Sequence, residues 1–150
     1  MLTIRVNAES SAPPERVLEA ARDFSPRRAK LWTNVKPKYL EVHESGEDFA
    51  DVTEGMWVVG LFWERNRYDW SQAGSVEATV TDSNVLEPGS TWEIRATPRN
   101  GGSAVEMILN RNFRRGPKGR IGAALNHTVA RWLWRPYLRH ALGVVEKQAT

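Results

Sequence analysis

The sequence predicts an α+β fold, in which a curved antiparallel sheet of about six to seven strands is covered by one long C-terminal helix. Three observations lead to this prediction. Short segments of alternating apolar and polar residues fill most of the chain between residues 39 and 113. Turn-forming sequences rich in glycine, proline and serine separate them, as in an antiparallel meander. Beyond residue 120, apolar residues recur at steps of three and four, the period of an α-helix.

The N-terminal part predicts one strand and two short helices. Leu2–Ala8 alternates between apolar and polar residues, which is typical of a half-buried strand. The stretch Ser10–Glu15 combines a capping hydroxyl, two prolines and an acidic residue, and it therefore indicates the start of a helix that extends to about Phe24. A second short helix is expected to begin at Ser25-Pro26 and to end at Pro37, because proline disfavours a helical residue before it.

Six further segments are expected to form strands, because each alternates and is followed by turn chemistry. These segments are Tyr39–Glu44, Phe49–Glu54, Trp63–Ser71, Val76–Asp82, Thr91–Thr97 and Ala104–Phe113. A helix is then expected from about Arg120 to Lys147. Pro136 lies inside it, and we expect a kink near Trp132, because proline clashes with the carbonyl four residues earlier.

Composition restricts the architecture and the chemistry. The 150 residues suit one domain over residues 1–150, and no repeat or linker-like stretch divides them. The absence of cysteine excludes disulfides, thiolate metal sites and a cysteine nucleophile. The longest apolar run, Met56–Phe62, is far shorter than the roughly 20 residues that span a bilayer. The first residues lack a signal-peptide pattern, so we expect a cytoplasmic protein with no transmembrane segment.

The net charge of +3 is distributed unevenly. Met1–Glu106 carries 12 basic and 17 acidic residues, whereas Met107–Val145 carries eight basic residues and no acidic one. The basic stretch Arg111–Arg120, continued by Arg131, Arg135 and Arg139, allows two interpretations. It could bind an anionic membrane or a nucleic acid, or it could fold back on the acidic part of the chain. No nucleic-acid recognition motif accompanies it, so we expect no nucleic-acid partner.

The order of these elements resembles the helix-grip fold of the START-related superfamily (SRPBCC), which includes polyketide cyclases and dehydrases, pollen-allergen-type binders and lipid-transfer domains. The resemblance covers nearly the whole chain. It depends on Ser11–Val17 after the first strand, Pro88-Gly89-Ser90 before a tryptophan-bearing strand, and the closing Leu138–Leu142. In addition, Trp63–Trp70 looks like cyclase-like members from actinobacteria. The resemblance implies a cavity between sheet and long helix, but no shared catalytic residue.

Strand alternation predicts which side chains face that cavity. In Trp63–Ser71 neither face is an ordinary core face, so we expect Glu64, Asn66, Tyr68 and Trp70 to line a wet cavity. A partly exposed strand with a solvated ladder of charges is the other interpretation. Apolar walls are expected from Trp92, Ile94, Met107, Leu109 and Trp132, and polar anchoring from Asn66, Tyr68 and Arg111. The expected partner is a hydrophobic small molecule, aromatic, polyketide-like or lipid-like, and no cofactor.

An enzymatic interpretation stands beside the binding one. In a polyketide aromatase/cyclase or dehydratase, Glu64, Tyr68 or His140 would transfer protons in a pocket poor in water. His127 is a weaker candidate, and His43 alternates outward. No cluster of histidines and carboxylates has the spacing of metal ligands, so we expect no metal. The run Met56–Phe62 could be a flap over the cavity, a homodimer contact, a membrane-touching loop or a buried extension of a strand.

Overall fold

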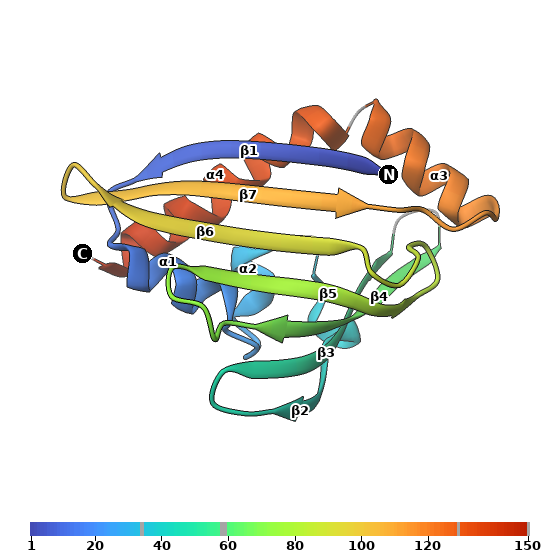
Figure 1. Cartoon of the computed structure of the whole chain (residues 1–150), viewed down its shortest axis with the longest axis horizontal. Helices are drawn as coiled ribbons and strands as arrows, with labels where there is room; N and C mark the ends of the chain where they lie inside the picture. The colour runs from blue at the N-terminus through green and yellow to red at the C-terminus, as the bar shows by residue number, and fades with distance from the viewer. Residues whose placement is uncertain (34, 58–59, 129, 150) are drawn as a thin grey trace.

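The computed structural model describes residues 1–33, 35–57, 60–128 and 130–149, and it arranges them as one curved sheet with helices on its inner side (Figure 1). Among these residues there are seven strands: β1 (Leu2–Ser10), β2 (Glu41–Ser45), β3 (Phe49–Trp57), β4 (Leu61–Asp69), β5 (Ser75–Ser83), β6 (Thr91–Arg99) and β7 (Gly102–Arg111). Each is antiparallel to its neighbours, in the order β1-β7-β6-β5-β4-β3-β2. The predicted α+β fold with an antiparallel sheet is confirmed.

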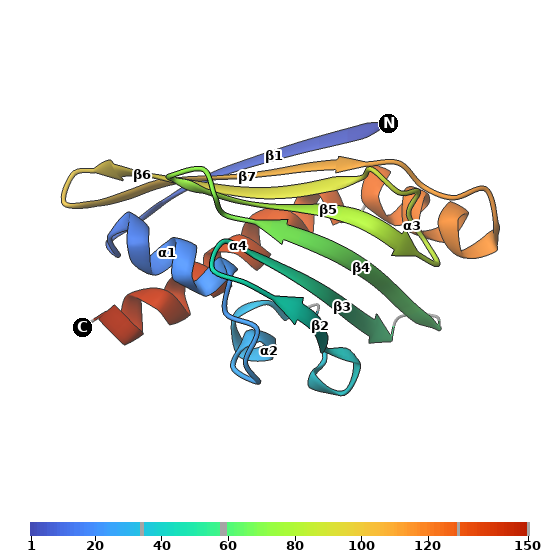
Figure 2. The same cartoon turned by 60° about the horizontal axis from the view of Figure 1, so that its bottom comes forward.

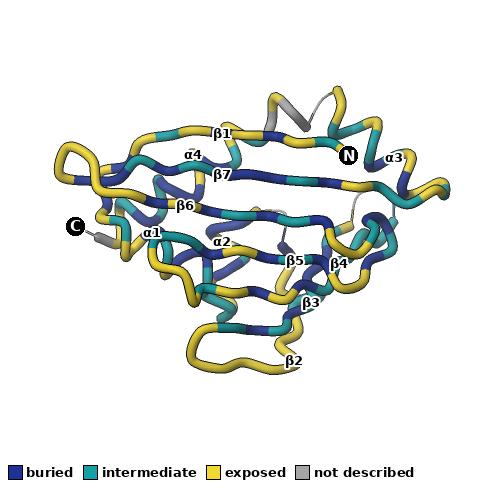
Figure 3. The backbone as a smooth tube through the Cα atoms, in the orientation of Figure 1, coloured by how far each residue is buried: buried dark blue, intermediate teal, exposed yellow. Residues whose placement is uncertain are grey.

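The sheet is a meander to which the first strand is added at one edge. β1 pairs with β7 along its whole length, from Leu2 opposite Arg111 to Ser10 opposite Ser103. A slip of one residue would turn the buried side chains of β1 toward solvent, so the alternation of Leu2–Ala8 fixes this register. Figure 3 shows the resulting alternation of buried and less buried positions along the strands.

The helices are α1 (Pro14–Ala21), α2 (Arg28–Leu31), α3 (Pro117–His127) and α4 (Ala130–Ala149), and Pro37–Tyr39 form a 3-10 turn, η1. Figure 2 shows α1, α2 and α4 on the concave side of the sheet, with β2 and β3 curving round toward α2. The two short helices expected after the first strand are therefore present. No helix among the described residues has the length and apolar character needed to cross a membrane.

The C-terminal helical segment differs in detail from the single kinked helix that we expected. It begins with Pro117, as the first turn of a helix favours, and α3 ends at His127. Thr128 is the C-cap residue, and both its backbone N–H and its hydroxyl donate to the carbonyl of Ala124. The second helix, α4, starts at Ala130 and contains Pro136 in its interior. The interruption thus lies before Trp132, and Pro136 does not end the helix.

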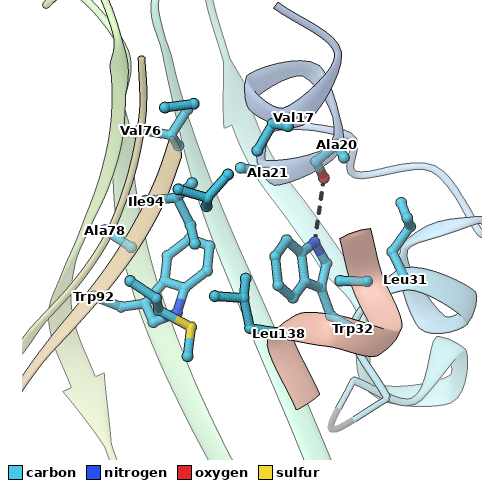
Figure 4. Packing of buried hydrophobic residues seen from close by; sticks show 14 of the residues in the cluster. Val17, Ala20, Ala21, Leu31, Trp32, Val76, Ala78, Trp92, Ile94 and Leu138 are labelled. Carbon is cyan, nitrogen blue, oxygen red and sulfur yellow. Dashed lines mark hydrogen bonds between the residues drawn. The ribbon is translucent and has the colours of Figure 1, made fainter. Parts of the chain in front are cut away.

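The core lies between the concave face of the sheet and helices α1, α2 and α4. The predicted inward side chains of the sheet are buried: Val76, Ala78, Val80, Trp92, Ile94, Ala96, Val105, Met107 and Leu109. Trp32 packs edge to face on Trp92, with ring centroids 5.5 Å apart. The indole nitrogen of Trp32 donates to the carbonyl of Ala20 (3.2 Å), so the Trp32 ring connects α1 to the sheet (Figure 4).

Much of the basic C-terminal third is bound to the rest of the molecule. Arg139 donates to the carbonyl of Glu9 at 2.6 Å and pairs with Glu146 at 3.2 Å. Arg114 donates to the carbonyl of Ser83 at 2.6 Å, and it pairs with Asp82 at 3.4 Å. These contacts favour the interpretation in which the positive charge folds back on the chain.

Candidate functional site

A cavity of about 430 Å³ opens at the end of the molecule where the β3–β4 hairpin faces α3 and α4. Its volume is within the range of ~300–1,000 Å³ typical of small-molecule sites. Most of its walls are apolar. They are formed by Val35, Met56, Phe62, Trp63, Val85, Leu86, Phe113, Leu125 and Trp134. The β-bulge between β4 and β5, at Arg65 and Asn66, lies beside this cavity and bends the sheet there.

Polar side chains gather where the cavity continues toward the core. Glu54, Glu64, Arg111 and Tyr137 line it there, and the same four line a second cavity of about 20 Å³. That smaller chamber also contacts Arg28, Tyr68 and three tryptophans, Trp32, Trp92 and Trp134. Its volume suffices for about one water-sized group with polar neighbours. The site therefore has a large apolar compartment and a small polar inner end.

A buried network of three side chains forms one wall of the inner end. The Arg28 Nε donates to Glu54 Oε1 at 2.8 Å, and its Nη2 donates to the Tyr68 hydroxyl at 2.9 Å. The Tyr68 hydroxyl in turn donates to Glu54 Oε1 at 2.8 Å. Only 2% of the Arg28 side chain and 10% of the Glu54 side chain are exposed. A charge this deeply buried is costly without a partner, so Arg28 and Glu54 each need the other, and the Tyr68 hydroxyl bonds to both.

The short helix α2 holds Arg28 in place. Arg28 Nη1 donates to the carbonyls of Ala21 and Asp23. These carbonyls lie at the end of α1 and just beyond it, where helix carbonyls lack partners within the helix. The guanidinium also lies over the ring of Phe24, 4.6 Å from its centroid. One side chain thus connects the end of α1 to β3 and β4, and it fixes the geometry of the inner end of the cavity.

The network shifts the ionisation of its members in predictable directions. Burial alone would lower the pKa of Arg28, but the charge of Glu54 and the neighbouring tyrosine hydroxyls outweigh burial and raise it. Burial raises the pKa of Tyr68 well above its ordinary value of 10.0, and the charge of Glu54 adds to this. Burial also raises the pKa of Tyr137. Arg28 is therefore a permanent cation, and both phenols are neutral at physiological pH.

A second ion pair faces the first across the inner end. Arg111 Nη1 and Glu64 Oε2 are 3.3 Å apart, and Asn66 Nδ2 donates to Glu64 Oε1 at 3.1 Å. The Arg111 side chain is 10% exposed and that of Glu64 26% exposed. Asn66 itself is buried, and its hydrogen bond to Glu64 fixes the orientation of that carboxylate. The structure thus brings together Glu64, Asn66 and Arg111, as the strand alternation predicted.

The predicted site residues on the strands, apart from Trp70, fall into three groups. Glu64, Tyr68, Trp92 and Arg111 line one or both cavities. Asn66 is buried directly behind them, as described above. Ile94, Met107 and Leu109 face the same side of the sheet but are fully buried in the core, and they are not among the described residues that line either cavity.

Three predicted site residues are not among the described residues that line either cavity. Trp132 is 82% exposed, because the interruption after His127 resets the helical phase and turns Trp134 and Tyr137 inward instead. His140 is exposed and its Nε2 lies 3.0 Å from the carbonyl of Lys30, outside both cavities. Trp70, beyond the opposite end of β4, donates from its indole nitrogen to the carbonyl of Glu47.

The apolar run Met56–Phe62 forms the end of the β3–β4 hairpin, and its residues 58 and 59 lie outside the described part of the chain. Met56 and Phe62 line the large cavity, whereas Trp57 is 65% exposed. Lys118 Nζ donates to the carbonyl of Leu61 at 3.1 Å, which connects the hairpin to the start of α3. The run therefore supplies one wall of the cavity.

Arg28, Glu54 and Tyr137 are among the polar lining residues that were not predicted as site residues. Glu54 lies on the same face of β3 as the buried Ala50 and Val52, so the apolar character of that face was a readable signal of its burial. Arg28 offers no such signal, since α2 is only four residues long. From the aromatic segment Trp132–Tyr137, Trp134 and Tyr137 line the large cavity, in place of the predicted Trp132. Among the described residues, no three histidines or carboxylates lie together as metal ligands would.

Comparison with known proteins adds information at the level of the fold. No protein-family model matches the chain, and no curated protein matches its sequence. Among solved structures, the protein TTHA0849 of Thermus thermophilus superposes with a TM-score of 0.80 at 16% identity, covering 99% of this chain and 100% of that one. The Zhui aromatase/cyclase of Streptomyces sp. R1128 gives a TM-score of 0.76 at 14% identity, covering 99% and 96%.

A START superfamily protein from Mycobacterium smegmatis also superposes over almost the whole of both chains. Its TM-score is 0.72 at 10% identity, and the match covers 97% of this chain and 98% of that one. Identities this low show the fold alone. Together with the seven-stranded sheet and the C-terminal helix, they show that this chain has the START-like helix-grip fold that its sequence resembles.

Proposed function

We propose that this protein binds a largely hydrophobic small molecule in the cavity between the β3–β4 hairpin and helices α3 and α4. The observation that carries the proposal is the cavity itself, a volume of about 430 Å³ with apolar walls and a polar inner end. Such a combination is typical of ligand sites, where apolar area supplies affinity and a few polar groups fix orientation. The START-like fold supports the proposal at a general level, since the superposing proteins include an aromatase/cyclase.

The orientation of the ligand follows from the two compartments. Its apolar body would lie against Phe62, Phe113 and Leu125, and its polar end would face Glu54 and Arg111. Burying apolar ligand surface contributes about 25 cal/mol per Å², so the large compartment would supply most of the affinity. Aromatic and polyketide-like molecules combine a flat apolar body with oxygen atoms, and they suit this arrangement.

A cavity-filling substitution tests the proposal. Leu125 lines the cavity from α3, so Leu125→Trp adds volume inside it, whereas Ala124→Trp places the same side chain on an exposed position next to it. We expect Leu125→Trp to weaken the binding of the uncharged fluorescent dye Nile red about ten-fold or more. Ala124→Trp should bind the dye as the unmodified protein does. Equal affinity of both variants would contradict binding in this cavity.

Catalysis in the same cavity, of the aromatase/cyclase or dehydratase type, is the second candidate function. It is favoured by one observation, the presence of two carboxylates, Glu54 and Glu64, at the inner end. Tyr68 fits this role poorly, because its raised pKa keeps the phenol protonated and its hydroxyl is already bonded to Glu54. If the protein is an enzyme, Glu64→Gln should abolish turnover of a bound substrate while it retains binding.

A further inference from the structure

We infer that the cavity selects uncharged ligands whose polar end both donates and accepts hydrogen bonds, and that it discriminates against carboxylates and phosphates with the same apolar body. The inference rests on the proposed function, namely that this cavity binds a hydrophobic small molecule. It goes further by assigning the ligand's charge and its hydrogen-bonding groups.

The charges at the inner end are balanced. The charged residues that line the two cavities, among those the structure describes, are Arg28, Glu54, Glu64 and Arg111. Arg28 pairs with Glu54 at 2.8 Å, and Arg111 pairs with Glu64 at 3.3 Å. Each cation thus has a carboxylate of its own, and neither is left over to neutralise an incoming anion.

An anionic ligand would therefore disturb the site. Its charge would leave water for an apolar cavity, and it would lie near two carboxylates as well as two guanidinium groups. An anion bonded to the remaining donors of Arg111 would lie close to the carboxylate of Glu64, and one that displaced Glu64 would leave that partly buried carboxylate without its partner. An uncharged polar group avoids both penalties.

Hydrogen-bonding capacity at the inner end is only partly used. Within the described part of the chain, the Arg111 guanidinium donates through Nη1 alone, so Nε and Nη2 remain as donors. Glu54 accepts both of its bonds at Oε1, from Arg28 and from Tyr68, and no described donor bonds to Oε2. Arg111 and Glu54 both line both cavities. A ligand hydroxyl could therefore accept a hydrogen bond from Arg111 and donate one to Glu54. A ligand with a hydroxyl next to a carbonyl could do the same.

Three naphthalene probes with the same ring test this selection by isothermal titration calorimetry at neutral pH. The first, 2-naphthol, is uncharged and both donates and accepts, whereas 2-naphthoate is an anion. We expect 2-naphthol to bind at least ten-fold more tightly than 2-naphthoate. The third probe, 2-methoxynaphthalene, keeps the acceptor but lacks the donor. It should bind more weakly than 2-naphthol, by about ten-fold or more, as the loss of one hydrogen bond to a carboxylate implies.

Glu64→Gln tests the charge balance directly. It removes the carboxylate that neutralises Arg111, so the affinity for 2-naphthoate should rise about ten-fold while that for 2-naphthol changes little. Glu93→Gln is the matched control, because Glu93 pairs with Arg95 at 2.6 Å on the opposite face of the sheet, and it should leave all three affinities unchanged.

Several outcomes would overturn the inference. The native protein alone decides the first part, since equal or tighter binding of 2-naphthoate contradicts selection against anions even if Glu64→Gln fails to fold. A folded Glu64→Gln variant with an unchanged preference contradicts the role of charge balance. Equal binding of 2-methoxynaphthalene and 2-naphthol contradicts the assigned donor. If no probe binds and Nile red does not bind either, the proposed function itself fails.

Discussion

Buried polar side chains determine the shape of the inner end of the cavity. Tyr68 is an example, because its hydroxyl accepts from Arg28 and donates to Glu54 while its ring packs edge to face on Phe24 at 4.7 Å. Its apolar body thus contributes to the core and its hydroxyl completes a charged network. Removing the hydroxyl alone would leave Arg28 and Glu54 each without one buried partner.

Tyr68→Phe should therefore lower the free energy of unfolding by about 1–3 kcal/mol at neutral pH. Since burial raises the pKa of Tyr68 above its ordinary value of 10.0, the unfolded chain loses this proton at lower pH than the folded protein does. The hydroxyl's contribution is fully present below pH 10.0 and declines as pH rises above it. Urea unfolding of both proteins from pH 7 to pH 11 measures this difference.

Tyr39→Phe serves as the control, because Tyr39 lies in the turn η1 and takes no part in the hydrogen bonds described for Arg28, Glu54 and Tyr68. It should change stability little at neutral pH. A Tyr68→Phe variant as stable as the unmodified protein would show that the hydroxyl is not part of a stabilising network. A difference that grows above pH 10.0 would contradict the direction of the pKa shift.

At the scale of elements, strands were predicted more accurately than helices. Each predicted strand overlaps an observed one, because alternation and turn residues are local signals that survive in the fold. The break between α3 and α4 was missed because the apolar three- and four-residue steps continue through it. The backbone leaves the helical conformation at the C-cap Thr128 (φ −112°, ψ −82°), and apolar periodicity does not detect such a change.

The phase of α4 can be tested with two neighbouring tryptophans. Trp134 lines both cavities, packs edge to face on Tyr137 at 5.2 Å and donates to Asn126 at 3.3 Å. Trp134→Ala should therefore destabilise the protein by about 2–4 kcal/mol, whereas the exposed Trp132→Ala should change stability by less than about 0.5 kcal/mol. Thermal unfolding compares the two variants. A larger effect at Trp132 would contradict the helical phase.

At the scale of the whole molecule, alternation along the strands predicted the inward face but not the depth of each residue. Glu64, Tyr68, Trp92 and Arg111 line the cavities as predicted, because a strand's period of two decides the face of the sheet. Met107 and Leu109 share that face and yet lie in solid core. Which part of the face borders a cavity depends on where the helices pack, and no local pattern contains that information.

The Arg28–Glu54 pair shows the same limit more sharply. The two residues lie on α2 and β3, and they meet only because the sheet curves round toward α2 (Figure 2). Charge balance was likewise visible in the sequence only as an acidic first part and a basic last part. In the folded molecule Arg111, from the basic part, pairs with Glu64 from the acidic part. Opposite charges from the two parts of the chain therefore balance at the inner end of the cavity.

Ligand binding in this cavity is the central claim, and an NMR titration tests it most directly. Uniformly ¹⁵N-labelled protein is titrated with 2-naphthol, and the shift of every backbone amide is followed. The largest shifts should occur at the residues that line the two compartments, among them Glu54, Glu64 and Leu125, while Glu93 and its neighbours on the opposite face of the sheet stay constant. Shifts confined to that opposite face, or none at saturating probe, would contradict the claim.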